Sequence, residues 1–154
     1  MTATKAANDL DASIDIAAPA DAVWRVVSDV RRTGEWSPEC LRVVPIGRVR
    51  RGSFLIGLNR RGQTRWPTLS RITRFEPGKR IAWRVLTNSS VWSYTLQATD
   101  TGCALSCARR TPDGIGRFAG WFTRRYLGGQ AGHDAELHAG MRTGLEQIKS
   151  ITES

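Results

Sequence analysis

The hydrophobic pattern near the start of the chain changes from alternation to helical spacing. Ile14 and Ile16 alternate with polar residues, as in a strand with one buried face. Pro19 follows at a position that suits the first turn of a helix. Beyond it, apolar residues recur at helical spacing, at Val23, Trp24, Val27 and Val30. Residues 14–36 therefore predict a strand, a helix and a second short helix that ends near Trp36.

Six further segments have the composition of strands, and short turn-forming segments separate most of them. These segments are residues 41–46, 52–60, 64–75, 80–87, 91–98 and 102–110. Because the connections are so short, we expect an antiparallel meander. From about residue 117 the pattern becomes that of a long amphipathic helix. Its apolar stripe consists of Phe122, Tyr126, His133, Leu137, Met141, Leu145 and Ile148.

Alternation within three of these strands indicates which side chains face the interior. We expect one side of each strand to point inward: Phe54, Ile56 and Leu58; Ile81, Trp83 and Val85; Trp92, Tyr94 and Leu96. Leu55 and Leu86 blur this assignment, because they place apolar side chains on the opposite face. A register shift of one residue would exchange the two faces of any strand.

Three glycines, Gly128, Gly129 and Gly132, interrupt the predicted C-terminal helix. Each glycine inside a helix costs about 0.5–1 kcal/mol relative to alanine. Two interpretations remain open: the helix breaks at this point, or another part of the chain packs unusually close to it.

Length and composition indicate one globular domain with a substantial core. The chain has 154 residues, of which 40% are hydrophobic and 24% charged. We expect a flexible leader over residues 1–9 and a single ligand-binding domain over residues 10–154. No window approaches the roughly 18 consecutive apolar residues of a membrane span, and the start lacks an apolar signal region. These observations predict a cytoplasmic protein.

The three cysteines are expected to be free thiols. Cys103 and Cys107 lie on the same side of one predicted strand, but their Cα atoms would be roughly 13 Å apart, which is beyond disulfide reach. Cys40 has no evident partner.

Positive charge is concentrated in the predicted sheet. The net charge is +9, and the stretch from Arg42 to Arg84 holds twelve basic residues against the single acid Glu76. Such a surface suits nucleic acid, an acidic membrane or an anionic partner. The alternative is a solvated outer sheet face, on which arginines alternate with inward side chains.

The order of these elements and four local motifs resemble one known superfamily. The motifs are APADAVW at 18–24, VSD at 27–29, GEWSPE at 34–39 and EPGKRIAW at 76–83. The chain resembles, over about residues 10–150, the polyketide cyclase/dehydrase and START-like lipid-transfer superfamily, abbreviated SRPBCC. The resemblance implies an α+β helix-grip fold: a curved seven-stranded antiparallel sheet around a long C-terminal helix, with two short helices after the first strand. It also implies binding of lipids, sterols, polyketides or hormones, with cyclisation in some members.

A curved sheet around one helix leaves a gap between them, which is the expected ligand cavity. The expected lining is Trp36, Phe54, Ile56, Leu58, Trp66, Trp83, Trp92, Tyr94, Phe122, Tyr126, His133 and Leu137. The six tryptophans of the chain supply large rigid faces that suit a planar or greasy ligand. The alternative is that these side chains simply fill the core.

Candidate chemistry in this cavity is sparse. His133, on the apolar stripe, is the one weak catalytic candidate, and Tyr94, Tyr126, Gln130, Asn59 and Cys107 are further hydrogen-bonding groups. No triad, carboxylate pair or phosphate-binding loop is present. His133 and His138 are five residues apart and do not share a helix face, so we expect no metal and no cofactor.

Three functions follow from these observations. The first is a noncatalytic carrier or sensor of a small hydrophobic molecule, the second a polyketide aromatase/cyclase that uses the same cavity, and the third a basic interaction module that contacts RNA or the ribosome. The first needs only the fold and the cavity, so we favour it and leave enzymatic activity and oligomeric state open.

Overall fold

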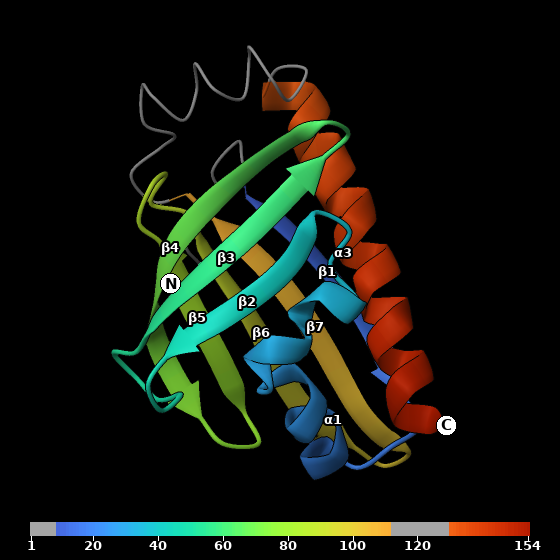
Figure 1. Ribbon diagram of the computed structural model, residues 1–154. Coiled ribbons are helices and arrows are strands. Elements are labelled where there is room, and N and C mark those ends of the chain that lie inside the picture. Colours follow the sequence, from blue (N-terminus) through green and yellow to red (C-terminus); the bar gives the residue numbers. More distant parts are fainter. Residues whose placement is uncertain (1–8, 112–129) are drawn as a thin grey trace, which may run out of the picture.

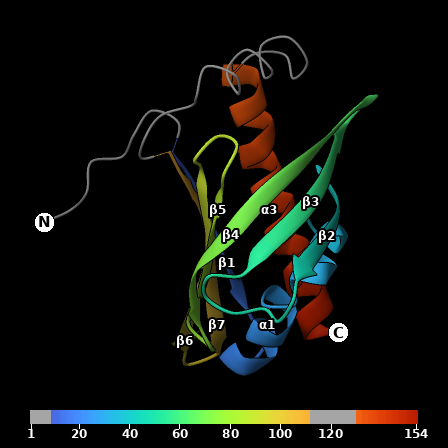
Figure 2. The same cartoon turned by 60° about the vertical axis from the view of Figure 1, so that its left-hand side comes forward.

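The structure is a computed structural model, which describes residues 9–111 and 130–154, with side chains in the last helix from Asp134 onward. Its elements are β1 (Leu10–Ile16), α1 (Ala20–Val27), η1 (Val30–Glu35), β2 (Cys40–Ile46), β3 (Phe54–Arg61), β4 (Thr64–Glu76), β5 (Arg80–Val85), β6 (Val91–Thr99), β7 (Gly102–Arg110) and α3 (Gln130–Glu153). The strands form one seven-stranded antiparallel sheet in the order β1-β7-β6-β5-β4-β3-β2. The sheet curves around α3, and α1 and η1 lie at one end (Figures 1 and 2). The predicted helix-grip order is confirmed.

The opening segment folds as its pattern predicts. The carbonyl of Pro19 accepts hydrogen bonds from the N–H groups of Ala22 and Val23, which starts α1. The helix buries Val23, Val26 and Val27 against the core. Trp24, in contrast, packs edge-on against Phe75 of β4, with ring centroids 5.4 Å apart. Trp24 therefore anchors α1 to the sheet.

The inner face of the sheet, which faces α3, carries most of the core. Register places Ile14 of β1, Leu105 of β7 and Leu96 of β6 in one row across the strands; Leu105 and Leu96 belong to the core, and the partly buried Ile14 packs against it. The buried stripe of α3 consists of Met141, Leu145 and Ile148. The predicted inward orientation of β5 and β6 is confirmed by burial of Ile81, Val85, Tyr94 and Leu96.

The predicted orientation of β3 is wrong. Phe54, Ile56 and Leu58 are 40%, 45% and 41% exposed, whereas Leu55 is 5% exposed. Leu55 pairs with Ser70 of β4, which in turn pairs with Val85, and all three are buried on the inner face. The pairing register therefore turns the more hydrophobic side of β3 outward.

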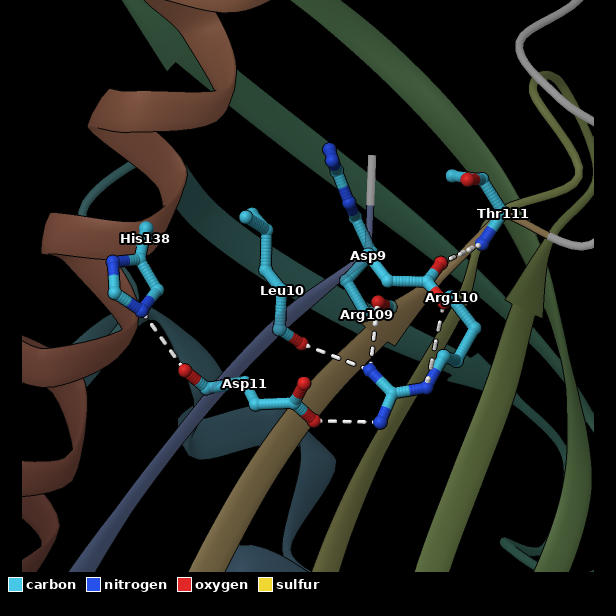
Figure 3. Close-up of polar contacts among 7 residues, drawn as sticks. All are labelled: Asp9, Leu10, Asp11, Arg109, Arg110, Thr111 and His138. Carbon is cyan, nitrogen blue, oxygen red and sulfur yellow. Dashed lines mark hydrogen bonds and ion pairs between the residues drawn. The ribbon is translucent and has the colours of Figure 1, made fainter. Parts of the chain in front are cut away.

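The start of β1 is more firmly packed than a flexible leader would be. Asp9, which was expected to belong to the leader, is 8% exposed, and its carboxylate accepts the N–H of Thr111 at 3.0 Å. Arg110 of β7 donates to the carbonyl of Leu10 at 3.1 Å and to the carboxylate of Asp11 at 2.6 Å (Figure 3). Asp9 is therefore packed against the end of β7, while residues 1–8 lie outside the described residues.

Other expectations have mixed outcomes. Cys40, Cys103 and Cys107 are free, as predicted. The predicted start of the C-terminal helix near residue 117, together with Gly128 and Gly129, lies outside the described residues, and Gly132 lies within α3. Among the described helices, none has both the length and the apolar composition needed to cross a bilayer.

Candidate functional site

A hollow lies between α3 and the inner face of the sheet, next to the segment that follows η1. Its lining consists of Trp36, Ser37, Pro38, Glu39, Trp92, Tyr94, Cys107, Glu136, Leu137, Gly140, Met141 and Gly144. The free space is about 60 Å³. Ligand pockets for small molecules usually span about 300–1,000 Å³. A ligand with fused rings would therefore have to displace some of the lining side chains.

Two glycines of α3 bring the helix unusually close to the segment after η1. A Cβ atom on Gly144 would lie 2.8 Å from the carbonyl oxygen of Trp36, and one on Gly140 would lie 3.2 Å from Cγ of Pro38. The two glycines are four residues apart and share one helix face. This face therefore forms one wall of the hollow. The hydrophobic pattern of the sequence did not predict this role, although glycine in a helical pattern is a signal of close packing.

The hollow contains a buried hydrogen-bond donor. Trp36 is 3% exposed, and its indole N–H lies toward the Tyr94 hydroxyl but meets no acceptor with hydrogen-bond geometry among the described residues. The Tyr94 hydroxyl and the Cys107 thiol belong to the same lining. An unpaired buried donor costs about 1–3 kcal/mol, which a ligand with an acceptor atom would recover. The hollow thus favours an apolar ligand that carries a hydrogen-bond acceptor.

Burial keeps both titratable groups of this cluster neutral. It raises the pKa of Tyr94 well above its ordinary value, Cys107 acts in the same direction, and the approach of the Trp36 indole opposes the shift in part. Burial also raises the pKa of the Cys107 thiol to about 12, against a smaller opposing effect of its hydrogen bond with Tyr94. A protonated thiol is a poor nucleophile, and a protonated phenol is a hydrogen-bond donor rather than a base. The cluster is therefore suited to binding.

An ion pair crosses the rim of the hollow. Arg61, at the end of β3, donates through Nε to the carboxylate of Glu136 on α3 at 2.6 Å. Their side chains are 32% and 48% exposed. Such a solvated pair contributes little to stability, about 0–1 kcal/mol. It nevertheless links the tip of the β3–β4 hairpin to the helix that forms one wall.

The polar residues at the start of α3 have separate partners. Asp134 forms a buried ion pair with Arg109 of β7 at 2.9 Å, Glu136 binds Arg61, and Nε2 of His138 lies 2.9 Å from the carbonyl oxygen of Asp11 (Figure 3). No group of three or more metal-capable side chains occurs within residues 9–111 and 134–154. Asp134, Glu136 and His138 therefore serve to fasten α3 to the strands.

The structure gathers some of the predicted site residues and separates others. Trp36, Trp92, Tyr94 and Leu137 line the hollow. Trp83 stacks obliquely on Tyr94, with centroids 6.0 Å apart, and Trp66 lies on the inner-face register of β4. Phe54, Ile56 and Leu58 face away, as described above. Phe122, Tyr126 and the side chain of His133 lie outside the described residues.

The sequence model of the family described as polyketide cyclase / dehydrase and lipid transport matches residues 8–152. The chain therefore belongs to this family, an SRPBCC-type family whose members have the helix-grip fold. No curated protein matches the sequence.

Solved structures show the same fold. The Zhui aromatase/cyclase from a Streptomyces species is 17% identical, with a TM-score of 0.75 over 94% of this chain and 93% of that one. A polyketide-cyclase-like protein from Corynebacterium glutamicum is 23% identical, with a TM-score of 0.59 over 95% and 89%. The di-domain aromatase/cyclase StfQ of the steffimycin biosynthetic pathway is 17% identical, with a TM-score of 0.73, and this chain spans 50% of its length. At these identities the likeness establishes the fold alone.

Proposed function

We propose that this protein binds a small hydrophobic ligand with a hydrogen-bond acceptor, such as a planar aromatic ketone, in the hollow between α3 and the sheet, as a carrier or sensor. The observation that carries the proposal is the buried indole N–H of Trp36 in an aromatic hollow, for which residues 9–111 and 134–154 offer no acceptor with hydrogen-bond geometry. The ligand accepts this hydrogen bond, and its rings contact Trp92 and Tyr94. Leu137 and Met141, which line the same hollow, move outward to make room.

The protonation states support binding rather than catalysis. Tyr94 and Cys107 hold their protons at neutral pH, so they act on a ligand as neutral donors. A carrier or sensor needs no group that exchanges protons during its cycle, whereas a cyclase needs an acid or a base poised near the operating pH.

The test uses two probes, 1,4-naphthoquinone and naphthalene, with binding followed by quenching of tryptophan fluorescence. Trp36→Phe retains an aromatic ring but lacks the N–H. We expect it to weaken quinone binding about tenfold, which corresponds to one hydrogen bond of about 1.4 kcal/mol, and to leave naphthalene binding nearly unchanged. Trp24→Phe, at the α1–β4 contact, is the matched control and should change neither affinity. The proposed site would be ruled out if Trp36→Phe and Trp24→Phe lost the same quinone affinity, or if the wild-type protein bound neither probe.

The second candidate function is a polyketide aromatase/cyclase, favoured by the family to which the chain belongs and by the fold that it shares with named aromatase/cyclases. In that case His133 on α3 is the expected proton-transfer group. The test is turnover of a reactive poly-β-ketone by the purified protein. His133→Ala should abolish turnover, and unchanged turnover would exclude His133 from the mechanism.

A further inference from the structure

The outer face of β2, β3 and β4 carries an exposed apolar surface, which we call the outer patch. It consists of Val44, Ile46, Phe54, Ile56, Leu58 and Leu69, which are between 38% and 55% exposed. The described residues include only eight exposed large hydrophobic side chains, so most of them lie in this one surface. Contiguous exposed apolar surfaces of this kind mark interaction sites in soluble proteins.

Strand register arranges the patch in rows. The central row is wholly aliphatic, because Val44 pairs with Ile56, which pairs with Leu69. On one side of it, Ile46 pairs with Phe54, which pairs with Arg71.

On the other side, Arg42 pairs with Leu58, which pairs with Pro67. Beyond that row, Arg60 pairs with Arg65. All four of the arginines in these rows are exposed. The patch is thus an apolar stripe with cationic groups at diagonal corners and along one end.

The charge of this region limits what can cover it. Residues 40–75 contain nine arginines and no aspartate or glutamate. A second copy of the chain placed face to face would add the same arginines and supply no carboxylate from residues 40–75, because a two-fold contact uses the same surface on both partners. The patch therefore suits an occupant that supplies carboxylates as well as apolar side chains.

Nucleic acid and lipid fit this surface less well. Binding of single-stranded RNA relies on exposed aromatic faces for base stacking, but Phe54 is the only aromatic residue of the patch, and the guanidinium of Arg71 lies over its ring at 5.5 Å from the centroid. On a membrane, Arg71 and Arg42 would enter the acyl region together with the aliphatic side chains of their rows, at a cost of about 2.5–3.5 kcal/mol for each charge.

We propose that the outer patch docks an acidic amphipathic helix of a partner protein. Phe54, Ile56 and Leu58 span about 13 Å along β3, which nine residues of helix cover at 1.5 Å each. The apolar stripe of that helix lies along β3, and its flanking Asp and Glu side chains pair with Arg42 and Arg71. This surface is on the opposite side of the sheet from the hollow, so the proposal does not depend on the proposed ligand.

The test is a selection of a displayed library of helical peptides, with randomised positions on one face, against the purified protein. We expect enrichment of peptides with leucine or isoleucine at spacings of three and four and with aspartate or glutamate beside them. Affinity for a selected peptide should fall at least tenfold with Ile56→Asp and with Arg71→Glu. Arg25→Glu, an exposed site on α1 with the same change of charge as Arg71→Glu, should change affinity less than twofold.

Ile56→Asp alters a half-exposed side chain, so its thermal unfolding should stay cooperative, with a midpoint within about 5 °C of the wild type. Arg42→Glu, at the opposite corner of the patch, provides a second variant. The proposal is overturned if no acidic peptide is enriched, or if Arg25→Glu weakens binding as much as Arg71→Glu. Three further measurements assign the patch to another occupant: binding to phosphatidylglycerol vesicles, binding to single-stranded RNA, and self-association in sedimentation. The proposal is also overturned if Ile56→Asp abolishes any one of these and leaves peptide binding intact.

Discussion

The two faces of β3 carry similar side chains in very different surroundings. Leu55 on the inner face is 5% exposed, whereas its neighbour Ile56 on the outer face is 45% exposed. Both are large aliphatic residues in the same strand of the same sheet. They differ because α3, α1 and η1 pack on the inner side of the sheet (Figure 2). Burial in this protein therefore depends on which face the helices cover, and hydrophobicity alone does not determine it.

The arginines of the two faces differ in the same way. Arg109 on the inner face is 3% exposed and pairs with Asp134, whereas Arg71 on the outer face is exposed and lies over Phe54. An arginine buried in the interior needs a charged partner, because desolvation of an unpaired charge is costly. An exposed arginine such as Arg71 can instead pair with a carboxylate of another molecule.

Removal of the inner ion pair should have the largest effect on stability. Asp134→Ala leaves the Arg109 guanidinium buried without this carboxylate, and we expect a loss of about 3–5 kcal/mol in the free energy of unfolding. Glu136→Ala breaks an exposed pair on the same helix and should cost less than about 1 kcal/mol. Urea denaturation measures both. Equal losses would contradict the distinction between buried and exposed pairs.

The next prediction compares adjacent residues of β3. Leu55→Ala creates a cavity in the core and should destabilise the protein by about 2–4 kcal/mol. Ile56→Ala removes a side chain that is already half solvated and should cost less than about 1 kcal/mol. Thermal and urea unfolding report both variants. A larger loss for Ile56→Ala would mean that the two faces of β3 are assigned the wrong way round.

The buried thiol predicts a loss of stability in alkali. The pKa of Cys107 is about 12 in the folded protein and about 8.5 in an unfolded chain. Between these two pH values only the unfolded state releases the thiol proton. The free energy of unfolding therefore keeps its full value below about pH 8.5 and falls by about 1.4 kcal/mol per pH unit as the pH rises toward 12.

In the Cys107→Ala variant the free energy of unfolding should fall less steeply with pH over this range, although the variant is less stable than the wild type at pH 7. The remaining slope comes from Cys40 and Cys103 and, at higher pH, from Tyr94, because burial raises the pKa of each of these groups as well. The measurement is urea unfolding at a series of pH values between 7 and 11. Parallel profiles for the two proteins would show that the Cys107 thiol is not protected in the folded state.

Close packing of α3 can be tested at its two glycines. Alanine in place of glycine stabilises an ordinary helix by about 0.5–1 kcal/mol. At Gly144 the added Cβ would lie 2.8 Å from a backbone carbonyl oxygen, so we expect Gly144→Ala to destabilise the protein by about 1 kcal/mol or more. Gly140→Ala, where the neighbour is the ring of Pro38 at 3.2 Å, should have a smaller effect in the same unfolding assay.

The smallest expected effect concerns the rim of the hollow. Arg61→Ala removes the exposed pair with Glu136 and should change stability by less than about 1 kcal/mol. If the pair helps to hold the β3–β4 hairpin against α3, naphthoquinone should dissociate several times faster from this variant in stopped-flow fluorescence. An unchanged dissociation rate would limit the pair to a surface contact.

Local patterns were sufficient for most of the fold. Pro19 and the valines after it predict α1, and short turns such as the one at Gly78 predict antiparallel neighbours. They were insufficient for β3, because its inner side carries Leu55, Gly57 and Asn59 while its outer side carries three large apolar residues. Hydrophobicity within this strand alone therefore favours the wrong face.

The candidate site was predictable only in part, for a similar reason. Aromatic residues such as Trp36, Trp92 and Tyr94 were identified from their types and their places in the pattern. The roles of Gly140, Gly144 and Cys107 depend on contacts with segments far away in the chain. The sequence pattern of a single helix or strand does not predict such long-range contacts.

The order of elements and the antiparallel connections follow from the amino-acid sequence, because turns and hydrophobic periods act over a few neighbouring residues. Membership of the family follows from the match of its sequence model over residues 8–152. Three features depended on tertiary structure: which face of β3 is buried, the separate partners of Asp134, Glu136 and His138, and the small size of the hollow. Each of them arises from pairing register and helix packing between residues that are distant in sequence, and such contacts exist only in the folded chain.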